Sequence, residues 1–198
     1  NTITINVLSA PANPVVTGSN TISYIENDPA TVINPAITIS DADSSTLNRA
    51  LVSITSGFAS GQDVLSFTND GSTMGNIVGS YNAATGVLTL TSAGNSATLA
   101  QWQSALRAVT YSNSSDNPSV TNRTISYQVR DPGLLNSNTV TSTIQVTAVN
   151  DAAVIGGTTT GSVIEDVTTS ATGTLTVTDP DSPTTLSIQS QTGTYGTF

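Results

Sequence analysis

Alternating apolar and polar residues dominate this chain. In the segment 123–130 (RTISYQVR), Ile125, Tyr127 and Val129 fall on one face of an extended chain, and the residues between them are polar. The segment 139–149 (TVTSTIQVTAV) shows the same alternation. Because residues i and i+2 share a face of a strand, both segments are predicted to be half-buried antiparallel strands.

Further short strands are predicted between clusters of turn-forming residues such as Asp70-Gly71 and Thr85-Gly86. Their predicted ranges are 21–25, 32–40, 50–56, 64–68, 76–81, 86–92 and 109–112, and another alternating segment occupies 2–7. Many short strands joined by polar turns are typical of a β-sandwich. The predicted fold class is therefore all-β, an Ig-like antiparallel sandwich.

One segment follows a helical period instead. Leu99, Trp102 and Leu106 recur at helical spacing within 98–106 (TLAQWQSAL), and Ser96 or Thr98 can cap the N-terminus. We expect a short helix that covers an open end or edge of the sandwich. Trp102 could serve as a stacking surface for a sugar, but its place on the apolar stripe favours packing in the core.

An internal repeat indicates a tandem arrangement of domains. SYIE, which ends at Glu26, is followed by ITISDADS, and SVIE, which ends at Glu165, is followed by LTVTDPDS. We interpret residues 1–13 as the tail of a preceding repeat or a linker, 14–149 as the first sandwich domain and 150–151 as a joint. Residues 152–198 are then the N-terminal part of a second, truncated domain, because two or three strands cannot enclose a useful core.

Composition excludes several classes of function. The chain has 13 acidic residues, four basic ones, no histidine and no cysteine, and a net charge of −9. Nucleic-acid backbones would be repelled, and no apolar run approaches the ~18 residues of a membrane span. Without His or Lys the common general bases are missing, so we do not expect an enzyme.

Acidic residues gather at the predicted strand ends. Since successive antiparallel strands alternate in direction, one end of the first domain should collect six oxygen-bearing residues: Glu26, Asp116, Asn150, Asp151, Asp179 and Asp181. The opposite end should hold Asp41, Asp43 and Asp131. Any one Asp could simply be a turn former. Carboxylates gathered together repel one another, and hard oxygen ligands without His or Cys favour Ca²⁺ as the neutralising cation.

Several motifs resemble a known family. SYIEND, DADS, VTYSNSSDNPS, ISYQVRD and TVTAVND resemble the cadherin-like domains of large bacterial surface adhesins of the RTX and biofilm-associated type. The tail from Gly161, which ends QTGTYGTF, is similar to the opening half of a VCBS repeat.

The resemblance implies Ca²⁺ at domain junctions. Glu26 matches the first-strand acid of the family, Asp116 lies in a ligand loop, Asn150-Asp151 match the linker pair, and Asp179 and Asp181 match the Asp-x-Asp of the next domain. At the opposite end, LSAPANPVV stands where an Asn-Asp pair would be expected, so a site with Asp41, Asp43 and Asp131 is expected to be weaker.

The expected function is that of a calcium-rigidified structural extender on the bacterial cell surface, serving adhesion or biofilm formation. Its expected partners are neighbouring repeats of the same chain, with a host-surface or biofilm ligand bound through other domains and no membrane insertion by this segment. Two alternatives remain at this stage. A carbohydrate- or protein-binding sandwich would need exposed aromatic residues, and pairing of edge strands between copies would need an incomplete sheet.

Overall fold

The computed structural model describes residues 10–158, 160–167, 170–183, 192–193 and 196–197. The chain divides into two compact units, Asn1–Ala148 and Val149–Phe198. The strand predicted at 2–7 lies outside the described residues. The two units are described separately below.

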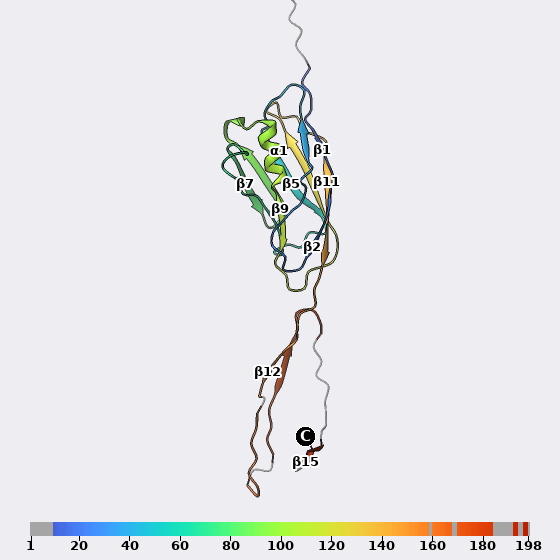
Figure 1. Ribbon diagram of the computed structural model, residues 1–198, viewed down its shortest axis with the longest axis vertical. Helices are drawn as coiled ribbons and strands as arrows, with labels where there is room; N and C mark the ends of the chain where they lie inside the picture. The colour runs from blue at the N-terminus through green and yellow to red at the C-terminus, as the bar shows by residue number, and fades with distance from the viewer. Residues whose placement is uncertain (1–9, 159, 168–169, 184–191, 194–195, 198) are drawn as a thin grey trace, which may run out of the picture. The chain divides into compact units, whose positions relative to one another are not determined.

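The larger sheet of the first unit has six strands. Its strand order is β2 (Thr21–Ile25), β11 (Val140–Thr147), β10 (Arg123–Arg130), β5 (Arg49–Ser56), β8 (Val87–Ser92) and β7 (Ile77–Asn82), of which β2, β5, β7 and β11 are labelled in Figure 1. Neighbouring strands are antiparallel except at one edge, where β2 runs parallel to β11 and Ile22 pairs with Ile144. This parallel pair is the one exception to the antiparallel pairing of this sheet.

A second layer completes the sandwich. It contains the sheet β3 (Thr31–Val32), β9 (Thr110–Asn113) and β6 (Asp63–Ser66), and the pair β1 (Val15–Thr17) and β4 (Thr38–Ser40). Inward side chains of both layers form one apolar core, as Val52 and Ile125 of the larger sheet and Leu65 and Tyr111 of the smaller one illustrate. The all-β sandwich with one short helix is therefore confirmed.

The segment predicted as one strand at 32–40 is two strands. Asn34 and Pro35 separate β3 from β4, and the Asn34 Oδ1 accepts a hydrogen bond from the Ala36 amide at 3.1 Å. Proline has no amide hydrogen to donate to a ladder, and this local Asn bond offers the backbone a turn instead. The chain can therefore change partner, so that β3 pairs with β9 and β4 with β1.

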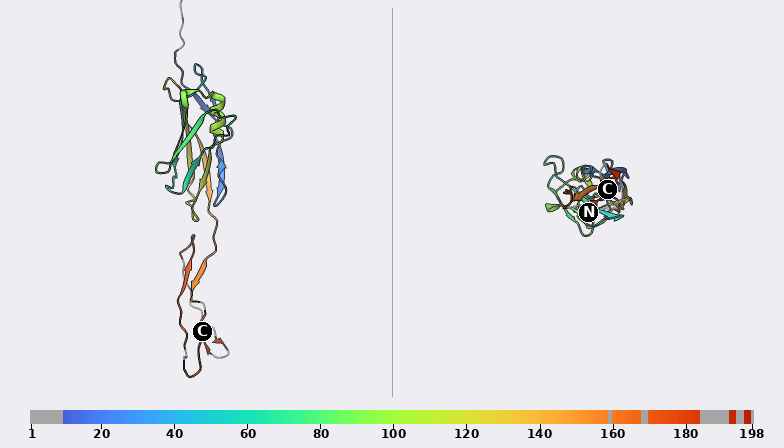
Figure 2. Two further views of the ribbon diagram at one scale, coloured as in Figure 1. Left: turned by 90° about the vertical axis from the view of Figure 1, so that its left-hand side faces the viewer. Right: turned by 90° about the horizontal axis from the view of Figure 1, so that it is seen from below.

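Among the described residues there is one α-helix, α1 (Leu99–Arg107), which follows a short 3₁₀ turn, η1 (Ala93–Asn95). Thr98 caps it in a capping box with Gln101. Trp102 is fully buried, which confirms that it packs in the core. The Arg107 side chain donates to the Ile37 carbonyl at 2.8 Å, which ties the helix to the segment leading into β4, and Figure 2 shows α1 beside the strands from a second direction.

In the second unit, β12 (Val154–Gly157) and β13 (Leu175–Thr178) pair antiparallel, and so do β14 (Thr192–Gly193) and β15 (Gly196–Thr197). Val154 and Ile155 on β12 are more than 60% exposed, so this hairpin does not bury its apolar residues. In the part of the chain that the structure describes, no helix is long and apolar enough to cross a bilayer.

Candidate metal centre

Glu26 lies in the turn that ends β2. The Asp28 amide donates to the Ile25 carbonyl at 3.0 Å, the Ile25 amide donates to the Asp28 carboxylate at 3.1 Å, and Asn27 adopts a positive φ of 63°. Asparagine tolerates this left-handed conformation better than most residues. The Glu26 amide also donates to the Thr147 carbonyl of β11 at 2.9 Å, and the residue is only 5% exposed. The parallel pair β2–β11 therefore fixes Glu26 beside the point where the chain leaves the first sandwich.

Asp116 lies in the loop 114–122, which joins β9 to β10. The loop is anchored at its start, where the Ser114 amide donates to the Gln62 carbonyl at 3.1 Å. It is anchored again near its end, where the Arg123 guanidinium donates to the carbonyls of Ser119 and Thr121 at 2.5 Å each. Asp116 itself is exposed. The loop is thus held to the sandwich at both ends while its acidic side chain faces solvent.

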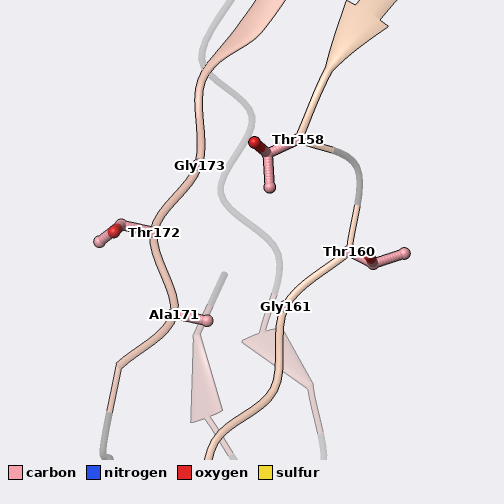
Figure 3. A pocket seen from close by; sticks show the side chains of 6 residues that line it. All are labelled: Thr158, Thr160, Gly161, Ala171, Thr172 and Gly173. Carbon is pink, nitrogen blue, oxygen red and sulfur yellow. The ribbon is translucent and has the colours of Figure 1, made fainter.

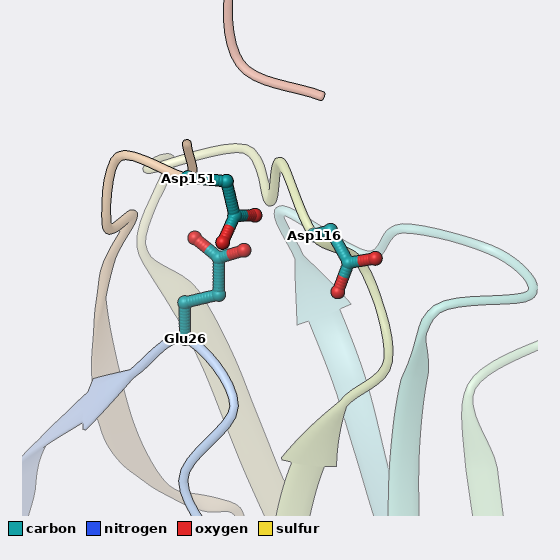
Figure 4. A group of neighbouring side chains, drawn as sticks. All are labelled: Glu26, Asp116 and Asp151. Atoms are coloured by element: carbon teal, nitrogen blue, oxygen red, sulfur yellow. The ribbon is translucent and has the colours of Figure 1, made fainter. Parts of the chain in front are cut away.

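Asp151 follows the last residue of β11, Thr147, by four positions, so the extended chain keeps it within about 14 Å of that strand end. Glu26, Asp116 and Asp151 each offer one carboxylate oxygen, and these oxygens lie within 4.8 Å of one another. Figure 4 shows the three side chains. Glu26 is buried, Asp151 half-buried and Asp116 exposed.

This group has the chemistry of a hard-cation site. Oxygens on opposite sides of a Ca²⁺ ion, each at 2.3–2.6 Å, stand about 4.6–5.2 Å apart, so one ion can bridge such a span. Carboxylates are preferred ligands of Ca²⁺, which takes six to eight oxygens and fills its shell with carbonyls and water. The cluster of acidic residues could therefore hold a metal ion.

The other predicted ligands of this end lie in the second unit. The Asp151 amide donates to Asp181 Oδ2, and Asp179 Oδ1 accepts from the Asp181 amide at 2.9 Å. The Asn150 side chain donates to the Asp151 carbonyl at 2.7 Å. Within this unit, the loop that follows β13 thus brings Asp181 to the backbone of Asp151.

Asp41, Asp43 and Asp131 form no comparable group among the described residues. Asp41 Oδ1 accepts from the amides of Asp43 and Ser44, and burial, together with the neighbouring Asp43, raises the pKa of the Asp41 carboxyl. Asp131 is 3% exposed and accepts from the Leu135 amide at 2.8 Å inside its own loop. Its visible role is to hold that loop.

Sequence reasoning missed a buried ion pair next to the Asp116 loop. Arg123 Nε lies 3.2 Å from Asp63 Oδ2, and both side chains are fully buried. Asp63 Oδ1 also accepts from the Tyr111 hydroxyl and the Asn113 side chain, each at 2.6 Å. Burial and the bond to Asp63 raise the pKa of the Tyr111 hydroxyl. The signal was present, since Arg123 shares the inward parity of Ile125 in a strand of period two.

A hollow in the second unit lies beyond the paired part of β12 and β13 (Figure 3). Its lining is made of uncharged residues, and the side chains of Thr158 and Ala171 point into it while Thr160 and Thr172 point away. The remaining lining residues are Gly161 and Gly173. Hydroxyl and backbone groups alone supply neither a nucleophile–base pair nor a charged binding group.

No protein-family model matches the chain. A segment of it is similar to Halomucin from Haloquadratum walsbyi, with 34% identity over 116 residues, which is 58% of this chain. The chain spans about 1% of the length of that relative, which is therefore a very long protein. Among solved structures, a chain of the cohesin–dockerin complex Coh-OlpC-Doc435 from Clostridium thermocellum aligns with this protein at 8% identity and a TM-score of 0.38. The alignment covers 72% of this chain and 100% of that chain.

Proposed function

We propose that this chain is a calcium-binding structural module of a long extracellular surface protein, in which Ca²⁺ stiffens the connection between consecutive domains. The group formed by Glu26, Asp116 and Asp151 carries the proposal. The similarity to one segment of a very long protein supports a module within a large surface protein. The role is structural rather than enzymatic, and adhesion or biofilm formation would be the task of the complete protein.

The physical reason for a cation is electrostatic. Two unit charges 4.8 Å apart repel by roughly 1–3 kcal/mol for effective dielectric constants between 80 and 20. Glu26 adds a desolvation cost for its charged form, because the residue is only 5% exposed. A divalent ion offsets both terms at once.

Stiffness would follow from ligands on either side of a joint. We propose that Asn150, Asp179 and Asp181 add their oxygens to those of the three clustered carboxylates. An ion held by both parts limits their relative rotation, whereas repulsion between unneutralised acids favours separation. Extracellular calcium modules bind at about 10⁻⁴–10⁻³ M, so such a site would be filled outside the cell and empty in the cytosol.

A carbohydrate-binding role has less support. Such sites use exposed aromatic faces. Among the described aromatic residues, Tyr24, Tyr111, Tyr127 and Trp102 are buried in the core, and Phe58, Phe67 and Tyr81 are partly buried against it. A protein-binding role for the complete molecule is compatible with the proposal, since a rigid extender would carry a binding domain away from the cell.

The first experiment is thermal unfolding of the 198-residue chain with 5 mM Ca²⁺ or with a chelator. Ligand binding stabilises by RT ln(1 + [L]/Kd), so a Kd of about 10⁻⁴ M gives about 2.3 kcal/mol and an increase in Tm of several degrees. The increase should vanish in Glu26→Gln and Asp116→Asn, and it should persist in the control Asp70→Asn, which changes an exposed carboxylate in another loop. Equal melting curves for the unmodified chain in the two conditions would refute calcium binding.

The second experiment tests stiffness. The chain has no cysteine, so Ser80→Cys and Thr176→Cys would place one spin label on an exposed position of each unit without background labelling. Ca²⁺ should narrow the distribution of distances between the labels, and Asp151→Asn should keep it broad. If Ca²⁺ raises Tm while the distribution stays unchanged, the ion stabilises the first unit but does not stiffen the joint.

A further inference from the structure

A chain of buried and part-buried hydrogen bonds connects the turn that carries Glu26 with the start of the loop that carries Asp116. The Tyr24 hydroxyl lies 2.8 Å from the Asp28 carbonyl, at the end of the Glu26 turn. The same hydroxyl lies 3.2 Å from the Asn113 carbonyl and accepts from the Asn113 amide at 3.1 Å. One phenol oxygen thus bridges β2 and β9.

Asn113 passes the connection to the ion pair. Its side-chain amide donates to Asp63 Oδ1 at 2.6 Å, and its Oδ1 accepts from the Ser115 amide at 2.9 Å, one residue before Asp116. Asp63 in turn accepts from Nε and Nη2 of the Arg123 guanidinium, and Nη1 of the same group donates to two carbonyls near the end of the loop. Both ends of loop 114–122 are therefore attached to one buried carboxylate.

We propose that this Asp63 network, formed by Tyr24, Asp63, Tyr111, Asn113 and Arg123, positions the carboxylates of Glu26 and Asp116 and thereby sets the affinity of the metal centre. The inference rests on the calcium role proposed above. The members of the network are positioning residues, since their polar atoms bond to one another and to the backbone of the turn and loop.

A loop that is ordered before the ion binds gives a higher affinity than one that must become ordered during binding. Loop 114–122 has no ladder of its own, so ordering its backbone at the moment of binding would reduce affinity. A network that holds the loop in place in advance removes that cost from the binding step. Removal of a group that hydrogen-bonds to a metal ligand and orients it typically lowers the affinity for the metal 10- to 100-fold.

Tyr24→Phe is the sharpest test. It removes only the bridging hydroxyl and leaves the ring, whose centroid lies 5.0 Å from that of Tyr111 in an edge-on contact. The matched control is Tyr127→Phe, which removes the hydroxyl of another fully buried tyrosine at a position paired with Val52 and Val140. Equilibrium dialysis of the full chain with ⁴⁵Ca²⁺ would give the Kd of each protein.

We expect Tyr24→Phe to bind Ca²⁺ about tenfold more weakly than the unmodified chain, and Tyr127→Phe to bind with unchanged affinity. Hydrogen exchange without Ca²⁺ should show faster exchange of amides in loop 114–122 for Tyr24→Phe alone. A purely structural role of the Tyr24 hydroxyl would lower the Tm of Tyr24→Phe and leave its Kd for Ca²⁺ unchanged.

The outcomes separate the two proposals. If the unmodified chain fails to bind Ca²⁺, the proposed function is refuted, and the exchange of loop 114–122 still tests whether the network orders it. If the unmodified chain binds and Asp116→Asn weakens binding while Tyr24→Phe does not, the calcium role stands and the positioning role is refuted.

Discussion

Replacement of Arg123 by methionine should be among the most damaging single changes in the first unit. The guanidinium and the Asp63 carboxylate are both fully buried, and Arg123→Met leaves that carboxylate without its counter-charge. It also removes the one guanidinium nitrogen that donates to both the Ser119 and the Thr121 carbonyl. Breaking a buried pair from one side costs about 3–5 kcal/mol, compared with a total stability of about 5–15 kcal/mol. For a unit of this size, the expected decrease in Tm is roughly 10–20 °C.

The second half of the same prediction is a double-mutant cycle. Asp63→Asn removes the negative charge and keeps an oxygen for the Tyr111 hydroxyl, which lies 2.6 Å from Oδ1. In Asp63→Asn/Arg123→Met no buried charge remains, so the double variant should be less destabilised than the sum of the single variants by about 1–3 kcal/mol. Arg49→Met, which removes a half-buried arginine of β5, is the control and should cost less than about 1 kcal/mol.

Urea unfolding followed by the fluorescence of Trp102, the one tryptophan of the chain and a fully buried one, gives the free energy of unfolding of each variant. Strict additivity in the cycle would refute the coupling of Asp63 with Arg123. A cost below about 1 kcal/mol for Arg123→Met would show that solvent reaches the pair.

Three smaller changes test local features of the first unit. Gly57→Ala should destabilise it by more than about 1 kcal/mol in urea, because Gly57 has a φ of +71° and a Cβ there would lie 2.3 Å from the Asn122 carbonyl oxygen. Thr98→Ala should cost about 1 kcal/mol in the same assay through loss of the helix cap, whereas Thr98→Ser should cost little. The pKa of Asp70 is lowered to about 2, first by the Thr73 hydroxyl and then by backbone amides, so its carboxyl ¹³C shift should titrate near pH 2. Since the folded pKa lies below the unfolded one, this contribution to stability is present above about pH 4 and lost as the pH falls toward 2, and Thr73→Val should raise the midpoint.

Strand positions were predictable from sequence wherever the period of two was uninterrupted. The predicted ranges 123–130 and 21–25 coincide with β10 and β2. The prediction was wrong at 32–40, where the apolar pattern continues through a turn set by Asn34 and Pro35. An alternating pattern shows only which residues are apolar. A proline within such a segment cannot donate a backbone hydrogen bond, so it can end the pairing with one neighbouring strand.

The alternation of strand direction is enough to locate the acidic cluster, whereas the Asp63 network depends on the order of the strands in the two layers. Strand alternation places Glu26, Asp116 and Asp151 at one end of the sandwich, and the structure brings these three carboxylates together, because each lies within a few residues of a strand end. The pairing of Asp63 with Arg123 depends instead on which strands are neighbours across the two layers, and they are 60 residues apart in sequence. The period of two puts Arg123 inside, and a buried arginine requires an acidic partner. Of the 13 acidic residues, the 12 besides Asp63 compete for that role until the strand order is known. The sequence therefore locates the acidic residues at the strand ends. The buried residues that position them can be identified only when the strand order is known.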